Sequence, residues 1–117
     1  MIIRIYRVKV AAGREKEWQD RVERLAIPWL RSLPGLRAFL PGKPPEGNNS
    51  RTFCMVMLWD RLDSVVTALG VNWERRVFIG DGGPLVEKSE LEHFEIYPSE
   101  LTNWWRETLP EFQLESR

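Results

Sequence analysis

The sequence predicts an α+β domain in which two β-α-β units form one four-stranded antiparallel sheet. Three observations lead to this fold class. Four short segments have the alternating or continuous apolar pattern of strands. Two longer segments carry apolar residues at helical spacing. The order strand, helix, strand occurs twice along the chain. A chain of 117 residues suits a single domain of ordinary size.

The first unit opens with a strand over residues 2–10, which places Ile3 and Ile5 on one face of the sheet. The opposite face of this strand receives five side chains: Ile2, Arg4, Tyr6, Val8 and Val10. Residues 14–33 then predict a helix, because large apolar side chains recur at steps of three or four: Trp18, Val22, Leu25, Trp29 and Leu33.

Proline disturbs this helix and later ends it. Pro28 has no backbone N–H, so we expect a kink near residues 24–28. Pro34 and Gly35 stop the helix, and residues 36–40 predict a short second strand.

The second unit opens with a strand over residues 51–60. Asp60 is expected to cap a helix with one apolar stripe, formed by Leu62, Val65, Val66 and Leu69. Gly70 is expected to end that helix, and residues 72–79 predict a further short helix. The last strand covers residues 89–97. This order of elements is the split βαβ pattern of a ferredoxin-like domain.

The third strand is apolar on both of its faces. Alternation puts Cys54, Val56 and Leu58 on one face and Phe53, Met55, Met57 and Trp59 on the other. Two helices cover only one face of a four-stranded sheet, and an apolar face left in water favours association. We therefore expect a homodimer in which a second copy of the chain packs sheet against sheet.

Composition excludes several other classes of partner. Lys and Arg together number 17, as do Asp and Glu, so the charge balance favours neither nucleic acid nor an anionic membrane. A single Cys cannot form an intrachain disulfide, and one Cys with one His cannot build an ordinary zinc site. The N-terminal segment is too short and too charged for a signal peptide, and no 18-residue apolar run exists, so we expect a cytoplasmic protein.

Several segments of this sequence resemble a known family. The first strand IIRIYRVKV, the helix over residues 14–33, the stop LPGLRAF, the junction MLWDRLDSV and the final HFEIY are similar to the dimeric α/β-barrel proteins. Within this superfamily the chain most resembles the antibiotic-biosynthesis-monooxygenase-like (ABM) domains. The resemblance covers residues 1–98, and residues 99–117 form a C-terminal extension expected to pack on the domain or on the dimer partner.

The resemblance implies two sheets that close into a barrel across the dimer, with a pocket between sheet and helices in each subunit. Some members oxygenate quinone-type aromatic substrates with no metal or flavin, and others bind and open haem. The oxygenating members use an Asn on the first strand, whereas this first strand carries Arg4, Tyr6, Arg7 and Lys9. The haem-degrading members use a helical His, whereas His93 lies on the last strand.

The candidate site residues each have a functional and a structural interpretation. His93 could act as a general base or a metal or haem ligand, or it could simply bond a neighbouring strand. Tyr6 and Arg4 could face the pocket as a proton donor and an anion partner, or they could lie at an edge or interface. The aromatic and Met residues that could hold a flat ligand, or could serve as core, are Met57, Trp59, Trp73 and Phe78.

These observations leave three functions open. The first is a cofactor-independent monooxygenase-like enzyme for a small aromatic or polyketide-type substrate, with His93 and Tyr6 as catalytic residues. The second is a non-catalytic ligand-binding or stress-related dimeric module. The third is haem binding or degradation, the one alternative that requires a cofactor. A catalytic pair of Cys54 and His93 is not expected, because one strand separates the two residues. Cys54 is therefore expected to be a small buried hydrophobe.

Overall fold

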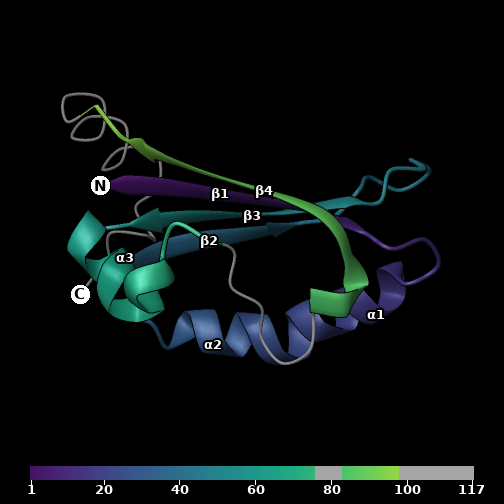
Figure 1. The fold of residues 1–117 in the computed structure, drawn as a ribbon, viewed down its shortest axis with the longest axis horizontal. Coiled ribbons are helices and arrows are strands. Elements are labelled where there is room, and N and C mark those ends of the chain that lie inside the picture. The colour runs from purple at the N-terminus through teal and green to yellow at the C-terminus, as the bar shows by residue number, and fades with distance from the viewer. Residues whose placement is uncertain (76–82, 98–117) are drawn as a thin grey trace.

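The computed structural model of the chain describes residues 1–75 and 83–97 (Figure 1). It confirms the predicted fold class, a ferredoxin-like α+β domain with one four-stranded antiparallel sheet in the order β2-β3-β1-β4. The strands are β1 (Ile2–Val10), β2 (Leu36–Gly42), β3 (Thr52–Trp59) and β4 (Val86–Glu95). The helical segments are α1 (Glu15–Arg21), η1 (Val22–Ala26), α2 (Ile27–Arg31), α3 (Leu62–Leu69), η2 (Gly70–Asn72) and η3 (Gly83–Leu85).

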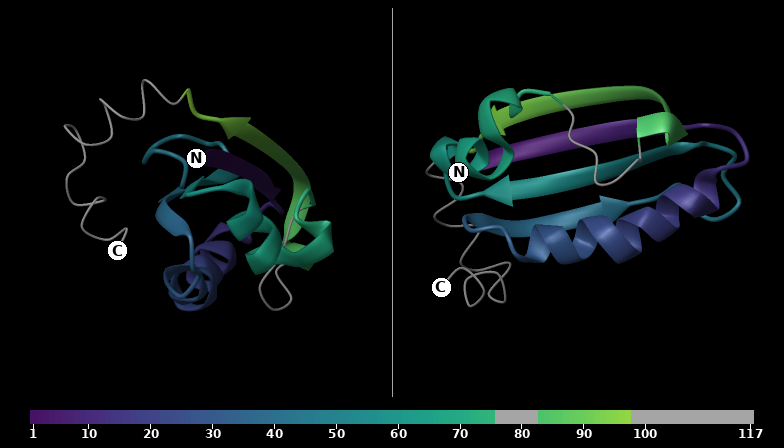
Figure 2. Two further views of the ribbon diagram at one scale, coloured as in Figure 1. Left: turned by 90° about the vertical axis from the view of Figure 1, so that its left-hand side faces the viewer. Right: turned by 60° about the horizontal axis from the view of Figure 1, so that its bottom comes forward.

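The helices lie on one side of the sheet, as Figures 1 and 2 show. The β3 side chains that face them are buried, namely Phe53, Met55, Met57 and Trp59. Together with Ile2, Leu30 and Val65, three of these four form the main core cluster, and Phe53 packs with Val8 and Val10 in a second one. One side of the sheet therefore carries the whole described core.

No described helix covers the other side of the sheet. Ile3 pairs with Leu58 and Ile5 pairs with Val56, so these four apolar side chains lie together on that side. Leu40 of β2 and Phe94 of β4 extend this row to both edges; they are 59% and 46% exposed. We call this surface the open face.

A π-helical turn, η1, replaces the simple kink expected near Pro28. The backbone N–H of Ile27 donates to the carbonyl of Val22, five residues earlier. Pro28 cannot donate at all, so the hydrogen-bond pattern is already irregular at this point of the helix. The wider turn joins α1 to α2 as one continuous helical segment over residues 15–31.

Three expectations for the second unit need correction. Asp60 does not cap α3; its Oδ1 accepts a hydrogen bond of 2.5 Å from the Ser64 hydroxyl, and α3 begins without a side-chain cap. The predicted apolar stripe is half wrong, because Leu62 and Val66 are exposed while Val65 is buried. The predicted last strand also begins three residues too late, because β4 begins at Val86. The charges at residues 87 and 88 hide the alternation there.

Other expectations fall partly outside the description. Gly70 ends α3 with a φ of +80°, as expected. Beyond it lies a short 3₁₀ turn, η2, and the remainder of the helix expected over residues 72–79, including Phe78, lies outside the described residues. The extension over residues 99–117 lies outside them as well. Within the described parts, the helices are too short and too polar to cross a membrane.

Gly35 joins the first helical segment to β2 and allows a sharp test of packing. Its φ is +84°, and a Cβ placed there would lie 2.4 Å from Ser64 Oγ. We expect Gly35→Ala to lower the free energy of unfolding by about 2–4 kcal/mol, because backbone strain and a steric clash add together. Denaturant unfolding measures this loss.

Gly13→Ala is the matched control. Gly13 has a φ of +80°, but a Cβ there would meet no atom within 4 Å. It should lose only the backbone contribution of about 1–2 kcal/mol. Equal losses in the two variants would contradict the packing described around Ser64.

Candidate functional site

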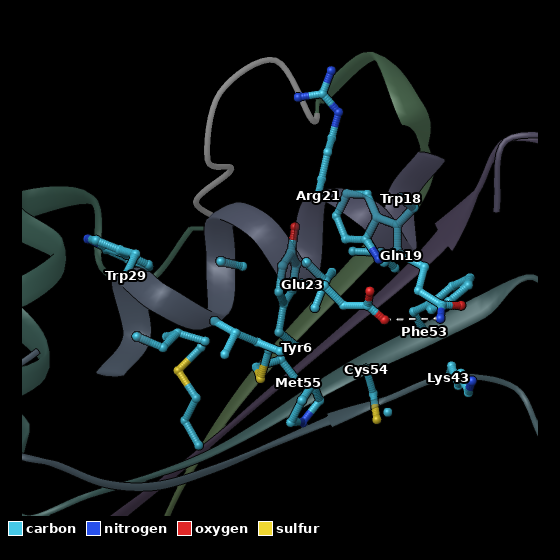
Figure 3. Close-up of a pocket in the computed structure, with 18 residues that line it drawn as sticks. Tyr6, Trp18, Gln19, Arg21, Glu23, Trp29, Lys43, Phe53, Cys54 and Met55 are labelled. Carbon is cyan, nitrogen blue, oxygen red and sulfur yellow. Dashed lines mark hydrogen bonds between the residues drawn. The ribbon is translucent and has the colours of Figure 1, made fainter. Parts of the chain in front are cut away.

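A cavity of about 290 Å³ lies between the helical segment 15–31 and strands β1, β2 and β3 (Figure 3). Its wall is mostly apolar. The sheet contributes Tyr6, Val8, Phe53, Met55 and Met57, and the helices contribute Trp18, Val22, Ala26, Ile27, Trp29 and Leu30. The volume is close to the lower end of the range of about 300–1,000 Å³ usual for small-ligand sites. The cavity therefore suits a compact, apolar and aromatic ligand.

A few polar side chains border this cavity: Gln19, Arg21, Glu23 and Lys43. The Gln19 side-chain amide donates a hydrogen bond of 3.2 Å to Glu23 Oε1. Figure 3 shows the Tyr6 ring rising from the sheet toward the helix. The same view shows the sulfur of Cys54 pointing away from the helix. The cavity thus has an apolar body with hydrogen-bonding groups along the helix.

A second cluster lies on the same side of the sheet, near the end of α3. Arg4, only 2% exposed, donates from Nη1 to the Trp73 carbonyl at 2.5 Å and lies 2.9 Å from His93 Nε2. Its Nη2 donates to the Arg75 carbonyl at 3.2 Å. The Trp73 and His93 rings meet edge to face with centroids 5.0 Å apart. Arg4 of β1 therefore ties the segment after α3 to the edge strand β4.

Burial shifts the titration of both basic groups in this cluster. Desolvation lowers the pKa of Arg4 to about 10, although the nearby Tyr6 opposes the shift. Desolvation and then the Arg4 charge lower the pKa of His93, and Glu74 acts in the opposite direction. Because a guanidinium only donates, Nε2 of His93 accepts and its ring proton lies on Nδ1. His93 is thus held as a neutral acceptor.

This arrangement predicts acid-sensitive stability. The pKa of His93 is lower in the folded chain than its ordinary value of 6.5, so the unfolded chain binds the proton more readily. The free energy of unfolding should therefore be highest above pH 6.5 and fall as the pH drops below that value. Denaturant unfolding between pH 7.5 and 5 measures the slope. In His93→Gln, which keeps an acceptor but no titration, the slope should be reduced; an unchanged slope would contradict this assignment.

The predicted site residues separate into two groups. Tyr6 and Met57 line the cavity. Arg4, Trp73 and His93 form the second cluster and are not among the residues lining the cavity. Trp59 is fully buried in the core, and its indole N–H has no hydrogen-bond partner among the described residues. Phe78 lies outside the described residues.

Sequence reasoning missed the helix side of the cavity. The sequence predicts that Trp18 and Val22 belong to the apolar stripe of the helix. This stripe does face the sheet, but the cavity remains between the two layers. The spacing of Gln19 and Glu23 could have indicated the polar border of the cavity, since residues four apart lie on one face of a helix, here next to that stripe. Among the described residues, no group of three or more His, Cys, Asp and Glu side chains could hold a metal ion.

Comparisons with known proteins give similarity in structure only. No protein-family model matches the chain, and no curated protein matches its sequence. A candidate antibiotic biosynthesis monooxygenase from Deinococcus radiodurans aligns with a TM-score of 0.65 at 17% identity, covering 83% of this chain and 93% of that one. Another from Nitrosomonas europaea gives 0.64 at 10% identity, with 82% and 98% covered.

A haem-degrading protein has the same architecture. MhuD from Mycobacterium tuberculosis, solved with two haems in its active site, aligns with a TM-score of 0.58 at 20% identity, covering 82% of this chain and 95% of that one. Identities at this level establish the fold and not the reaction. The chain therefore shares its ferredoxin-like fold with these solved structures, as the order of its elements predicted.

Proposed function

We propose that this protein is a cofactor-independent, monooxygenase-like enzyme that acts on a small aromatic or polyketide-type substrate. The observation that carries the proposal is the cavity of about 290 Å³ between the helical segment and the sheet. Its aromatic and Met side chains suit a flat ligand through stacking and adaptable packing. The similarity in fold to candidate antibiotic biosynthesis monooxygenases supports the same reading.

The chemistry requires a substrate that supplies its own electrons. A carbon acid next to an aromatic carbonyl loses a proton, and the resulting carbanion reacts with dioxygen. An apolar cavity favours this reaction, because it excludes water and brings the reactants together. The Tyr6 ring rises from the sheet toward the helix, and its hydroxyl would donate to the oxygen on which charge develops.

We also propose that the working unit is a homodimer. The open face carries apolar side chains on all four strands. Leu40 and Phe94 are exposed, and the others are half-buried: Ile3, Ile5, Val56 and Leu58. A contiguous apolar surface of this kind is uncommon on monomeric proteins. Arg7 and Glu92 form a 2.8 Å ion pair beside this row, which gives the surface a polar border. A second copy that packs sheet against sheet would cover the row symmetrically.

Haem binding is the alternative that MhuD suggests. The cavity fits haem poorly, because its volume is small for a substituted tetrapyrrole. The chain has one histidine, and His93 lies in the other cluster with its Nε2 beside Arg4. We therefore expect no Soret shift of the kind given by histidine ligation when haem is added.

Oxygen consumption with 1,8-dihydroxyanthrone tests the proposed activity. The protein should accelerate oxygen uptake, and Tyr6→Phe should slow it by at least about tenfold through the loss of one donor. Tyr97→Phe is the control, since Tyr97 is 78% exposed. Ligand binding without oxygen uptake would leave the non-catalytic module, and absence of both would refute the proposal.

A further inference from the structure

We propose that the C-terminal segment, residues 98–117, docks on its own domain as an amphipathic helix against the exposed side of α3. The surface that receives it consists of three exposed apolar side chains, which we call the α3 ledge: Leu62, Val66 and Val71. They come from α3 and η2, on the opposite side of the sheet from the open face. The docking does not depend on the proposed activity.

The sequence of the C-terminal segment has helical periodicity, although the segment lies outside the described residues. Large apolar side chains recur at i, i+3, i+4 and i+8, which places them on one face of a helix: Leu101, Trp104, Trp105 and Leu109. The residues between them are polar: Thr102, Asn103, Arg106, Glu107 and Thr108. Ser99 is a suitable N-cap, and Pro110 disfavours continuation of the helix. The pattern therefore predicts an amphipathic helix over residues 100–109.

Such a helix needs a surface to pack on. Isolated helices shorter than about 12–15 residues are marginal in water, and most helical stability in proteins comes from burying an apolar face. Trp104 and Trp105 make this face large, since an indole buries more area than most other side chains. We therefore expect the helix to form where its two indoles are buried.

The described chain ends close to α3. The backbone N–H of Ile96 donates to the Met1 carbonyl at 3.0 Å, which holds the chain at the start of β1. Ile2 pairs with Glu95 of β4 on one side and with Trp59 of β3 on the other. With two strand spacings between them, Glu95 and Trp59 lie roughly 10 Å apart. Since α3 begins at the third residue after Trp59, the end of β4 and α3 lie at the same end of the sheet (Figure 1).

The α3 ledge points toward the edge of the sheet at which β4 lies. The side chains of α3 that face the end of α2 line a shallow groove: Ser64, Thr67 and Ala68. A helix turns by about 100° per residue, so Leu62 and Val66 point roughly away from that groove, with the buried Val65 between the two sides. Because α2 contacts β2, at the other edge of the sheet, the ledge faces the β4 edge.

The dimensions of the two partners agree. Residues 97–99 join the end of the described pairing to the predicted helix, and three extended residues span roughly 10 Å. A helix over residues 100–109 would be about 15 Å long, and the eight residues of α3 extend about 12 Å. Leu62 and Val66 lie one helical turn apart, as do Leu101 and Trp105, so the two apolar rows can interdigitate.

Arginine-specific proteolysis of the full chain tests this docking. Arg106 lies within the predicted helix, so docking should protect the bond that follows it. Val66→Asp puts a charge on the α3 ledge and should speed the release of residues 107–117 by at least about tenfold. Thr67→Asp is the matched control, because it puts the same charge on the side of α3 that faces α2 and should leave the rate unchanged. Equal rates in the two variants would overturn the proposal.

A reciprocal pair of variants lies in the segment itself. Trp105→Ser should also speed cleavage by at least about tenfold, whereas Asn103→Ser, on the polar side of the helix, should not. The double variant Val66→Asp with Trp105→Ser should be cleaved no faster than the faster single variant, because both changes remove the same contact. Two effects that multiply would show that the two residues do not meet, and would overturn the proposal.

Two further measurements distinguish the other surfaces on which the segment could lie. Trp105→Ser should move the methyl NMR signals of Leu62 and Val66 and leave those of Leu40 in place, since an indole ring current acts only on near neighbours. Movement at Leu40 alone would place the segment on the open face and overturn the proposal. In Leu58→Lys, which carries a charge on the open face, the protection of Arg106 should persist. Its loss would assign the segment to the partner subunit, which would overturn docking on its own domain.

Discussion

Leu58→Lys is expected to dissociate the proposed homodimer into monomers. Leu58 lies near the centre of the open face, paired with Ile3 on one side and Ala38 on the other. A symmetric interface would bury two ammonium groups without partners, at a cost of about 2 kcal/mol or more each. The dimer dissociation constant should therefore rise by about 1,000-fold, since each 1.4 kcal/mol is a factor of ten. Sedimentation at micromolar concentration measures the change.

The control for this variant carries the same charge elsewhere. Val71 is 93% exposed and lies in η2, just after α3 and outside the sheet, so Val71→Lys should leave the association unchanged. Leu40→Lys, at a position 59% exposed on the open face, repeats the test where folding of the monomer is least affected. If the unmodified chain sediments as a monomer, the proposal that a second copy covers the open face is wrong.

Ala26→Trp is expected to abolish ligand binding. Ala26 is half-buried, lines the cavity and lies in the π-helical turn. An indole at this position would occupy the space that the ligand needs, so the affinity for 2-hydroxyanthraquinone should fall by at least about 100-fold. The cavity gives the new ring room, so the free energy of unfolding should change by less than about 1.5 kcal/mol.

Lys16→Trp provides the comparison, because Lys16 is exposed on α1 and is not among the cavity-lining residues. Lys16→Trp should bind 2-hydroxyanthraquinone with the affinity of the unmodified protein. Quenching of Trp fluorescence and a direct absorbance titration measure the two affinities. Equal affinities in the two variants would place the ligand outside this cavity.

Much of the fold could be predicted because local patterns determine it. The alternation along β3 correctly separated Met55 and Met57 from Val56 and Leu58, and strands of this kind have a fixed period of two. Glycine at residue 70 marked the end of α3 because a positive φ is needed there. The split βαβ pattern predicted that one strand separates Cys54 from His93, and β1 does lie between β3 and β4.

The site was harder to predict, because it depends on register and on space between layers. Arg4 and His93 lie opposite each other only through the pairing of β1 with β4, and no local pattern gives that register. The cavity exists because the helical segment does not fill the space above β1 and β3. The sequence pattern of an apolar stripe is the same whether the helix packs fully against a core or lines a cavity.

Methionine methyl NMR tests the central claim that this cavity is the ligand site. The chain has three methionines, and two of them, Met55 and Met57, line the cavity, whereas Met1 does not. On addition of 2-hydroxyanthraquinone, ring currents should shift the Met55 and Met57 methyl signals and leave Met1 unchanged. Unmoved signals at residues 55 and 57, or equal shifts at all three methionines, would contradict the account.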